Sequence, residues 1–192
     1  MEYVDDYSGY GNQVLYKMCE ERPLHNDIDT IRSKLWIIGR AYAASIERKA
    51  GEEFNIEDVA EILKESKLDQ EIENLNKIGR IDQNNIEVLL GTHDYLMQLF
   101  KKITGLEKRS LASKYLHFHA PKSVFIYDSI VRNELRKRLR AIGKTRFPIS
   151  KKYDSEYESH VLRCIYYRDK IYEKQFEALV SPRKLDSSLY GY

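Results

Sequence analysis

Helical periodicity is the sequence feature that most restricts the fold of this chain. In the stretch 27–50 the apolar residues that recur every three or four positions are Ile31, Leu35, Ile38, Tyr42 and Ile46. This spacing places them on one face of a helix. Comparable stretches are 55–66, 69–78, 84–103, 110–119, 128–142 and 154–180. The pattern predicts an all-α fold of about seven helices, in one compact body or two interlocked helical lobes.

Punctuating residues divide the chain into three regions. Residues 1–26 show no sustained period and are expected to form an N-terminal arm that lies on the body, with a loop or a short helix around 14–19. Residues 27–180 are expected to form the helical domain and 181–192 a C-terminal tail that is mobile unless Tyr190 and Tyr192 dock on the body. Helix 27–50 is predicted to be central and largely buried, because Trp36 and its neighbours widen its apolar face. Only 124–127 reads as a strand, and it lacks an obvious pairing partner.

Length and cysteine content indicate a protein that needs neither disulfides nor a metal ion for stability. A chain of 192 residues can bury a substantial core. Cys19 and Cys164 are too few and too isolated for a disulfide framework, which favours a reducing, cytoplasmic location. The acidic start lacks the features of a signal peptide, and no apolar run approaches the ~20 residues of a membrane helix. We therefore expect a soluble protein.

Charge is distributed unevenly along the chain. The segment 108–152 carries 13 Lys or Arg residues against Asp128 and Glu134, a net charge of +11, whereas residues 1–107 carry a net charge of −8. A basic segment of this size favours a polyanionic partner such as nucleic acid, because neutralising phosphates releases counterions. The alternative is that these basic residues form an ordinary solvated surface with no binding partner.

The stretch 110–139 combines reactive groups, a helix breaker and a helix start. Ser110, Lys114 and His117 lie at four- and three-residue spacing, so they share one helical face, while apolar residues line another. A lysine desolvated beside an aromatic core has a lowered pKa and can act as a nucleophile. The ordinary alternative is a solvated lysine on an amphipathic helix.

Asp128 follows the break at Pro121 and is the natural N-cap of the basic helix behind it. A capping carboxylate that faces a cleft can also act as a base or stabilise a developing cation. His117 and His119 are two positions apart, with no cysteine or carboxylate to complete a zinc set. We therefore expect neither a metal ion nor another cofactor.

These features together resemble the helix-hairpin-helix DNA glycosylase superfamily, most nearly its 8-oxoguanine glycosylase branch. The resemblance covers roughly 103–139: a lysine-bearing helix, a break at Pro121, a short extended piece, and Asp128 in Tyr127-Asp128-Ser129 opening a basic helix. The hairpin's Gly-x-Gly is missing, with only Gly105 nearby. The resemblance therefore does not extend to the glycines with which the family's hairpin binds duplex phosphates.

The family motif can be aligned with this sequence in two ways, and each alignment indicates a different nucleophilic lysine. Counting back from Pro121 places Lys108 at the nucleophile position. Matching the family's small residue to Ala112 instead places Ser110 there and leaves Lys114 one helical turn further on. Both lysines therefore stay candidates.

The resemblance implies a glycosylase or lyase that extrudes a modified base from nucleic acid, with DNA favoured, or that acts on a nucleotide. Lys114 or Lys108 would attack the sugar carbon, and Asp128 would assist. The implied base pocket contains Trp36, Tyr42, Ser110 and His117. The implied phosphate contacts are Arg132, Arg136, Lys137, Arg138 and Arg140.

A second hypothesis comes from a different functional class. It is a non-catalytic helical protein that uses its basic segment to hold nucleic acid or an acidic protein partner, for example as an accessory of a bacterial defence system. A covalent lysine adduct with damaged DNA would distinguish the enzyme from the binding protein.

Overall fold

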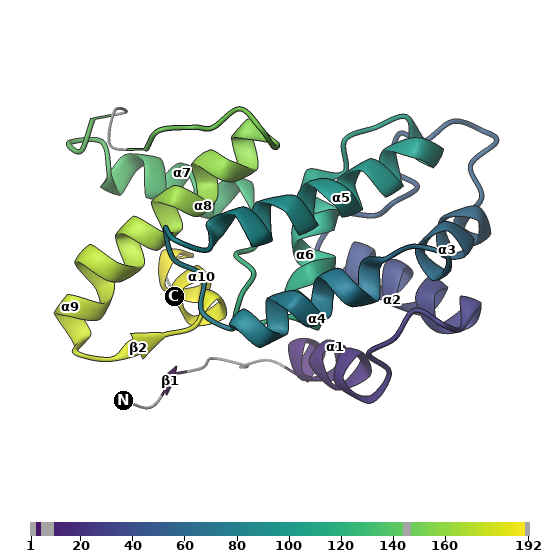
Figure 1. Cartoon of the computed structure of the whole chain (residues 1–192), viewed down its shortest axis with the longest axis horizontal. Helices are drawn as coiled ribbons and strands as arrows, with labels where there is room; N and C mark the ends of the chain where they lie inside the picture. Colours follow the sequence, from purple (N-terminus) through teal and green to yellow (C-terminus); the bar gives the residue numbers. More distant parts are fainter. Residues whose placement is uncertain (1–2, 5–9, 144–146, 191–192) are drawn as a thin grey trace.

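The computed structural model describes residues 3–4, 10–143 and 147–190, and the all-α prediction is confirmed (Figure 1). The α-helices are α1 (Tyr10–Glu21), α2 (Ile28–Ala41), α3 (Ile56–Lys64), α4 (Leu68–Ile78), α5 (Ile86–Thr104), α6 (Arg109–His119), α7 (Ser129–Arg138), α8 (Ser155–Tyr167), α9 (Glu173–Phe176) and α10 (Pro182–Leu189). A π-helical segment, Arg168–Tyr172, joins α8 to α9. Two two-residue strands, β1 (Tyr3–Val4) and β2 (Leu179–Val180), pair in parallel.

Three helices begin at N-cap residues that can be identified in the sequence. Asp27, Asn55 and Asp128 each accept a hydrogen bond from a backbone amide in the first turn of α2, α3 and α7. Such caps satisfy amides that have no partner within the helix. The predicted starts near these residues were therefore correct to within one or two residues.

Helix α6 is buried on all sides. It contacts α1, α2 and α5, and every residue from Leu111 to His119 is buried. The ordinary alternative of a solvated lysine on an amphipathic helix does not hold for Lys114, because this side chain is buried. A helix that is buried all round needs internal partners for its polar side chains, and these partners build the candidate site.

Two predicted helices are shorter than expected. Helix α2 ends at Ala41, and the chain turns back so that the Ala44 amide donates to Gly39 O at 2.8 Å. A Cβ on Gly39 would lie 2.9 Å from the Ser45 Cα, so the glycine allows this close approach. The predicted helix 154–180 ends at Phe176, where Glu177 adopts a positive φ of 50°.

The two segments that were expected outside the helical domain each contain a helix that packs on it. Helix α1 lies within the predicted arm 1–26 and contacts α2 and α6. Helix α10 lies within the predicted tail 181–192 and contacts α7, with Leu185 and Leu189 buried. The stretch 124–127, predicted as a strand, is a buried loop between α6 and α7. It lies beside the candidate site.

Candidate functional site

A buried ion pair joins the middle of α6 to the start of α7. Lys114 Nζ lies 3.7 Å from Asp128 Oδ2, and their side chains are 4% and 19% exposed. The amine also donates to Tyr42 O at 3.0 Å and lies 5.7 Å from the centroid of the Tyr42 ring. Three separate segments therefore meet at one amine.

The cap geometry of α7 orients Asp128 toward the lysine. Its Oδ1 accepts from the Ile130 amide at 2.8 Å, which leaves Oδ2 as the oxygen nearest to Lys114. The capping role and the ion pair use different oxygens of one carboxylate, so both can be present together.

Burial gives Lys114 the electrostatics of a potential nucleophile. Desolvation lowers the pKa of its amine, and the negative charges of Asp128 and Asp186 oppose this shift. The net pKa remains below the ordinary value of a lysine. A larger fraction of neutral amine is therefore present near neutral pH than for a solvated lysine.

Asp186 of α10 is a second carboxyl group beside the pair. Burial raises the pKa of Asp186 to about 7, against the opposing charge of Arg183. Arg183 Nη1 donates to Asp186 Oδ2 at 3.3 Å, whereas Oδ1 is buried and lacks a hydrogen-bond partner among the described residues. Helix α10 therefore places a titratable acid against the lysine.

Replacing Asp186 by asparagine should change how stability depends on pH. The native pKa of Asp186 lies above its unfolded value of ~3.9, so its stabilising contribution is full below pH ~4 and is lost as the pH rises to about 7. The difference spans about three pKa units, or roughly 4 kcal/mol at most. Urea unfolding of both proteins from pH 4 to 8 should show wild type losing stability relative to Asp186→Asn. A pH-independent difference would contradict the assignment.

His117 and Ser110, predicted to lie in a base pocket, hold the backbone beside the pair. His117 Nδ1 contacts Val124 O at 2.8 Å, and Nε2 contacts the Tyr16 hydroxyl at 2.6 Å. Burial lowers the pKa of His117 to about 4, so the ring is neutral at physiological pH. Ser110 Oγ donates to Tyr127 O at 3.1 Å. Both side chains thus position the loop that leads to Asp128.

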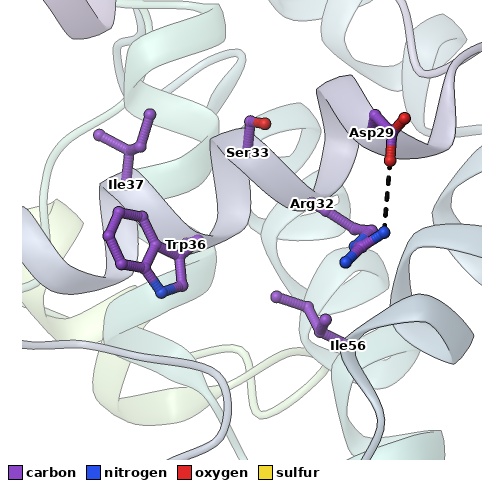
Figure 2. A pocket seen from close by; sticks show the side chains of 6 residues that line it. All are labelled: Asp29, Arg32, Ser33, Trp36, Ile37 and Ile56. Atoms are coloured by element: carbon purple, nitrogen blue, oxygen red, sulfur yellow. Dashed lines mark hydrogen bonds and ion pairs between the residues drawn. The ribbon is translucent and has the colours of Figure 1, made fainter.

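Trp36 does not lie in the buried core that was predicted for it. Its side chain is 56% exposed and lines a groove of about 510 Å³ between α2 and α3, with Ile37 and Ile56 nearby (Figure 2). The Arg40 guanidinium lies 5.9 Å from its ring centroid. The helix turns this residue outward while Leu35 and Ile38 face the core. Of the two predicted aromatic residues, Tyr42 is the one that contacts Lys114.

Lys108 lies just before α6 and points to a different part of the molecule. Its Nζ donates to Arg48 O at 2.6 Å, in the turn that follows α2. Burial lowers the pKa of this amine as well. The contact that distinguishes the two lysines is the approach to Asp128, and it is made by Lys114.

The basic residues of α7 are mostly engaged with acidic neighbours. Arg132 and Arg136 each lie 3.4 Å from Glu156, and Glu134 pairs with Lys137 at 3.8 Å and with Arg138 at 2.8 Å. Arg140 is exposed. Part of the charge of the expected phosphate contacts is thus balanced within the protein.

Sequence reasoning missed Asp186. The sequence does indicate a helix at this position. Ser181 is an N-cap residue and Pro182 occupies the first turn. Leu185 and Leu189 follow at four-residue spacing. These residues are sufficient to predict helix α10. They would not have shown that α10 lies over α7.

Among the described residues, no three His, Cys, Asp or Glu side chains are grouped so that they could hold a metal ion. Within the same residues, no helix is both long and apolar enough to cross a membrane. Comparison of the chain with known proteins found no matching protein-family model, curated protein or solved structure.

Proposed function

We propose that this protein is a glycosylase or lyase that acts on a modified base in nucleic acid through Lys114 and Asp128. The observation that carries the proposal is the 3.7 Å contact between Lys114 Nζ and Asp128 Oδ2. A lysine and an aspartate are the two groups that the glycosylase resemblance requires, and they come from helices on either side of the Pro121 break.

The proposed reaction begins with the neutral amine of Lys114. Nζ forms a bond to the sugar carbon that bears the base, and the bond from that carbon to the base breaks. The bonding electron pair leaves with the base, which takes a proton from water. Asp128 stabilises the positive charge that develops on the sugar. The hydroxide left by that water removes a proton from Nζ. The nitrogen lone pair then forms a double bond to the carbon as the bond from this carbon to the ring oxygen breaks, and the ring oxygen takes a proton from water, which gives a protonated imine.

Access to the pair requires movement of the groups that cover it. Lys114 is 3% exposed, and Tyr42, Asp186 of α10 and Tyr190 just after α10 lie beside the pair. Burial, the charges of Asp186 and Asp128, and hydrogen bonding to Asp128 together raise the pKa of the Tyr190 hydroxyl. We propose that α10 moves away when substrate binds and that its closure excludes water from the amine.

Borohydride reduction tests the proposed function directly. The protein is incubated with duplex and single-stranded DNA that contain either an abasic site or an oxidised guanine, and borohydride is added. Peptide mass spectrometry then locates any adduct. An adduct on Lys114 supports the enzyme, whereas an adduct on Lys108, or none on any substrate, overturns the proposed mechanism.

Replacing Asp128 by asparagine should slow the chemistry while preserving the fold. Asparagine caps a helix about as well as aspartate, so α7 should keep its start, while loss of the charge beside the buried lysine should lower the melting temperature. The variant lacks the carboxylate charge, and loss of such electrostatic stabilisation costs about 100-fold or more in rate. Single-turnover rates of adduct formation measure the effect. A rate within twofold of wild type would remove Asp128 from the mechanism.

The near-complete burial of Lys114 favours one alternative. In that alternative the ion pair only fixes α6 to α7, and the protein binds nucleic acid or an acidic partner without chemistry. Binding of DNA without an adduct on any substrate, with Lys114→Met binding as well as wild type, is the result expected for this function.

A further inference from the structure

Three guanidinium groups surround a pocket of about 410 Å³ between α7 and α8, on the side of α7 away from its start. The lining residues are Arg136, Leu139, Arg140, Gly143, Phe147 and Arg163. Arg136 and Arg140 come from α7 and the residues after it, whereas Arg163 comes from α8, outside the basic segment 108–152. The fold therefore adds a third arginine to a pair that the sequence already placed together.

Arg163 is held in position by its neighbours. Its Nη1 donates to Ser159 O at 2.7 Å, and its guanidinium lies 4.9 Å from the ring centroid of Phe147. Phe147 is only 7% exposed, so the ring is a fixed support. A guanidinium stacked on a buried ring loses little side-chain freedom when it binds a ligand.

The positive charge in this pocket exceeds the negative charge beside it. Desolvation and the charge of Arg136 lower the pKa of Arg163, against the charge of Glu156. Glu156 is also the partner of Arg136 and of Arg132, each at 3.4 Å. The single negative charge of Glu156 thus offsets only part of the positive charge of these guanidinium groups. An oxyanion in the pocket would reduce the repulsion between Arg136 and Arg163.

Guanidinium groups around one pocket suit a phosphate. Each presents a planar set of donors that can bind two oxygens at once, and a phosphate offers oxygens in several directions to donors that converge from two helices. A phosphate in a nucleic-acid backbone fits this arrangement, and the nearby ring of Phe147 keeps one wall of the pocket apolar.

We propose that the pocket formed by Arg136, Arg140 and Arg163 binds a backbone phosphate, and that the substrate of the Lys114 site is therefore a polynucleotide and not a free nucleotide. The second half rests on the proposed function. Asp128 and Arg136 are eight residues apart, which is about 12 Å along a helix axis at 1.5 Å per residue. At about 3.4 Å per nucleotide, this separation corresponds to three or four nucleotides. A mononucleotide cannot span it.

The salt dependence of binding tests the pocket without relying on catalysis. Binding of a nine-nucleotide single-stranded DNA is measured by fluorescence anisotropy from 50 to 200 mM salt, for wild type, Arg163→Gln and Arg140→Gln. Loss of one phosphate contact should lower the slope of log affinity against log salt by about 0.7. Lys102→Gln, an exposed change on α5, is the matched control and should keep the wild-type slope.

Two outcomes would overturn the proposal. The first is a slope unchanged in both arginine variants; because Arg140 is exposed, at least that variant should fold normally. The second is equal weakening of a nucleoside monophosphate and of the nine-nucleotide strand by Arg163→Gln, which would place the pocket at the nucleotide itself. Reduced slopes in a protein that forms no adduct would support the phosphate pocket while rejecting the lysine chemistry, so the two failures are distinguishable.

Discussion

Lys114→Met is expected to abolish the borohydride-trapped adduct, with a loss of more than 1,000-fold. The neutral amine at this position is the proposed nucleophile, and methionine has nothing that can form an imine. Methionine is unbranched and of similar length, so it should fill the space of a side chain that is 4% exposed. Adduct formation is measured by gel shift of labelled DNA after reduction.

The folded state should survive this change at some cost in stability. Removing one partner of a buried ion pair leaves the charge of the other partner uncompensated. Asp128 retains its hydrogen bond from the Ile130 amide, and Asp186 can remain protonated once the cation is lost. A cooperative melting transition well above the assay temperature would show that the variant is folded and that the lost adduct reflects chemistry.

Lys108→Met is the matched control. Lys108 is also partly buried and also donates to a backbone carbonyl, that of Arg48. The substitution should leave adduct formation within a few-fold of wild type. Loss of the adduct in this variant, with Lys114→Met still active, would assign the nucleophile to Lys108 and contradict the mechanism.

Local signals in the sequence were sufficient to place one half of the candidate site. An aspartate that follows a proline-marked break and precedes a helical stretch predicts an N-cap, and Asp128 is one. Capping depends on residues within one turn of each other, so no tertiary information is needed. The assignment of Lys114 over Lys108 needed the three-dimensional approach of α6 to α7.

The burial of α6 could not be predicted from its own residues. Its pattern reads as amphipathic, yet Lys114, His117 and Ser113 are buried with partners from other segments. Those partners are backbone carbonyls of Tyr42 and Val124 and the amide of Tyr127. Periodicity reports side-chain polarity and carries no information on which distant carbonyl a polar group will meet.

Trp36 shows the opposite error. An apolar side chain was assigned to the core, whereas it lies 56% exposed in the groove between α2 and α3. A folded surface contains many apolar atoms, so hydrophobicity alone does not place a single residue inside. Its neighbours Leu35 and Ile38 do follow the period and are fully buried.

The largest effect on stability is expected at Asp154, which connects the site helix to α8. Both carboxylate oxygens accept from Arg109 at 2.6 Å, and Oδ1 also accepts from the Tyr157 amide at 2.7 Å. Arg109 is the first residue of α6, and the side chain of Asp154 is only 6% exposed. One carboxylate therefore caps α8 and fixes the start of the helix that carries Lys114.

Asp154→Ala should lower the free energy of unfolding by roughly 3–4 kcal/mol. Loss of the cap costs about 1 kcal/mol, and removing one partner of a mostly buried charged pair costs about 2–3 kcal/mol more. For a chain of this length the melting temperature should fall by roughly 10 °C. Asp154→Asn is the matched control. Because asparagine caps well, this variant should lose only the charged part, about 2 kcal/mol.

The pH dependence of the same variants separates the charge from the cap. Burial raises the pKa of Asp154, but the hydrogen bonds from Arg109 and the Tyr157 amide outweigh it and leave the pKa below its usual value. Its contribution is therefore present above the unfolded pKa of ~3.9 and is lost as the pH falls through the native pKa. Chemical unfolding from pH 7 to pH 2 should show wild type and Asp154→Asn converging in acid. A constant gap between them would mean that packing, and not the ion pair with Arg109, connects α6 to α8.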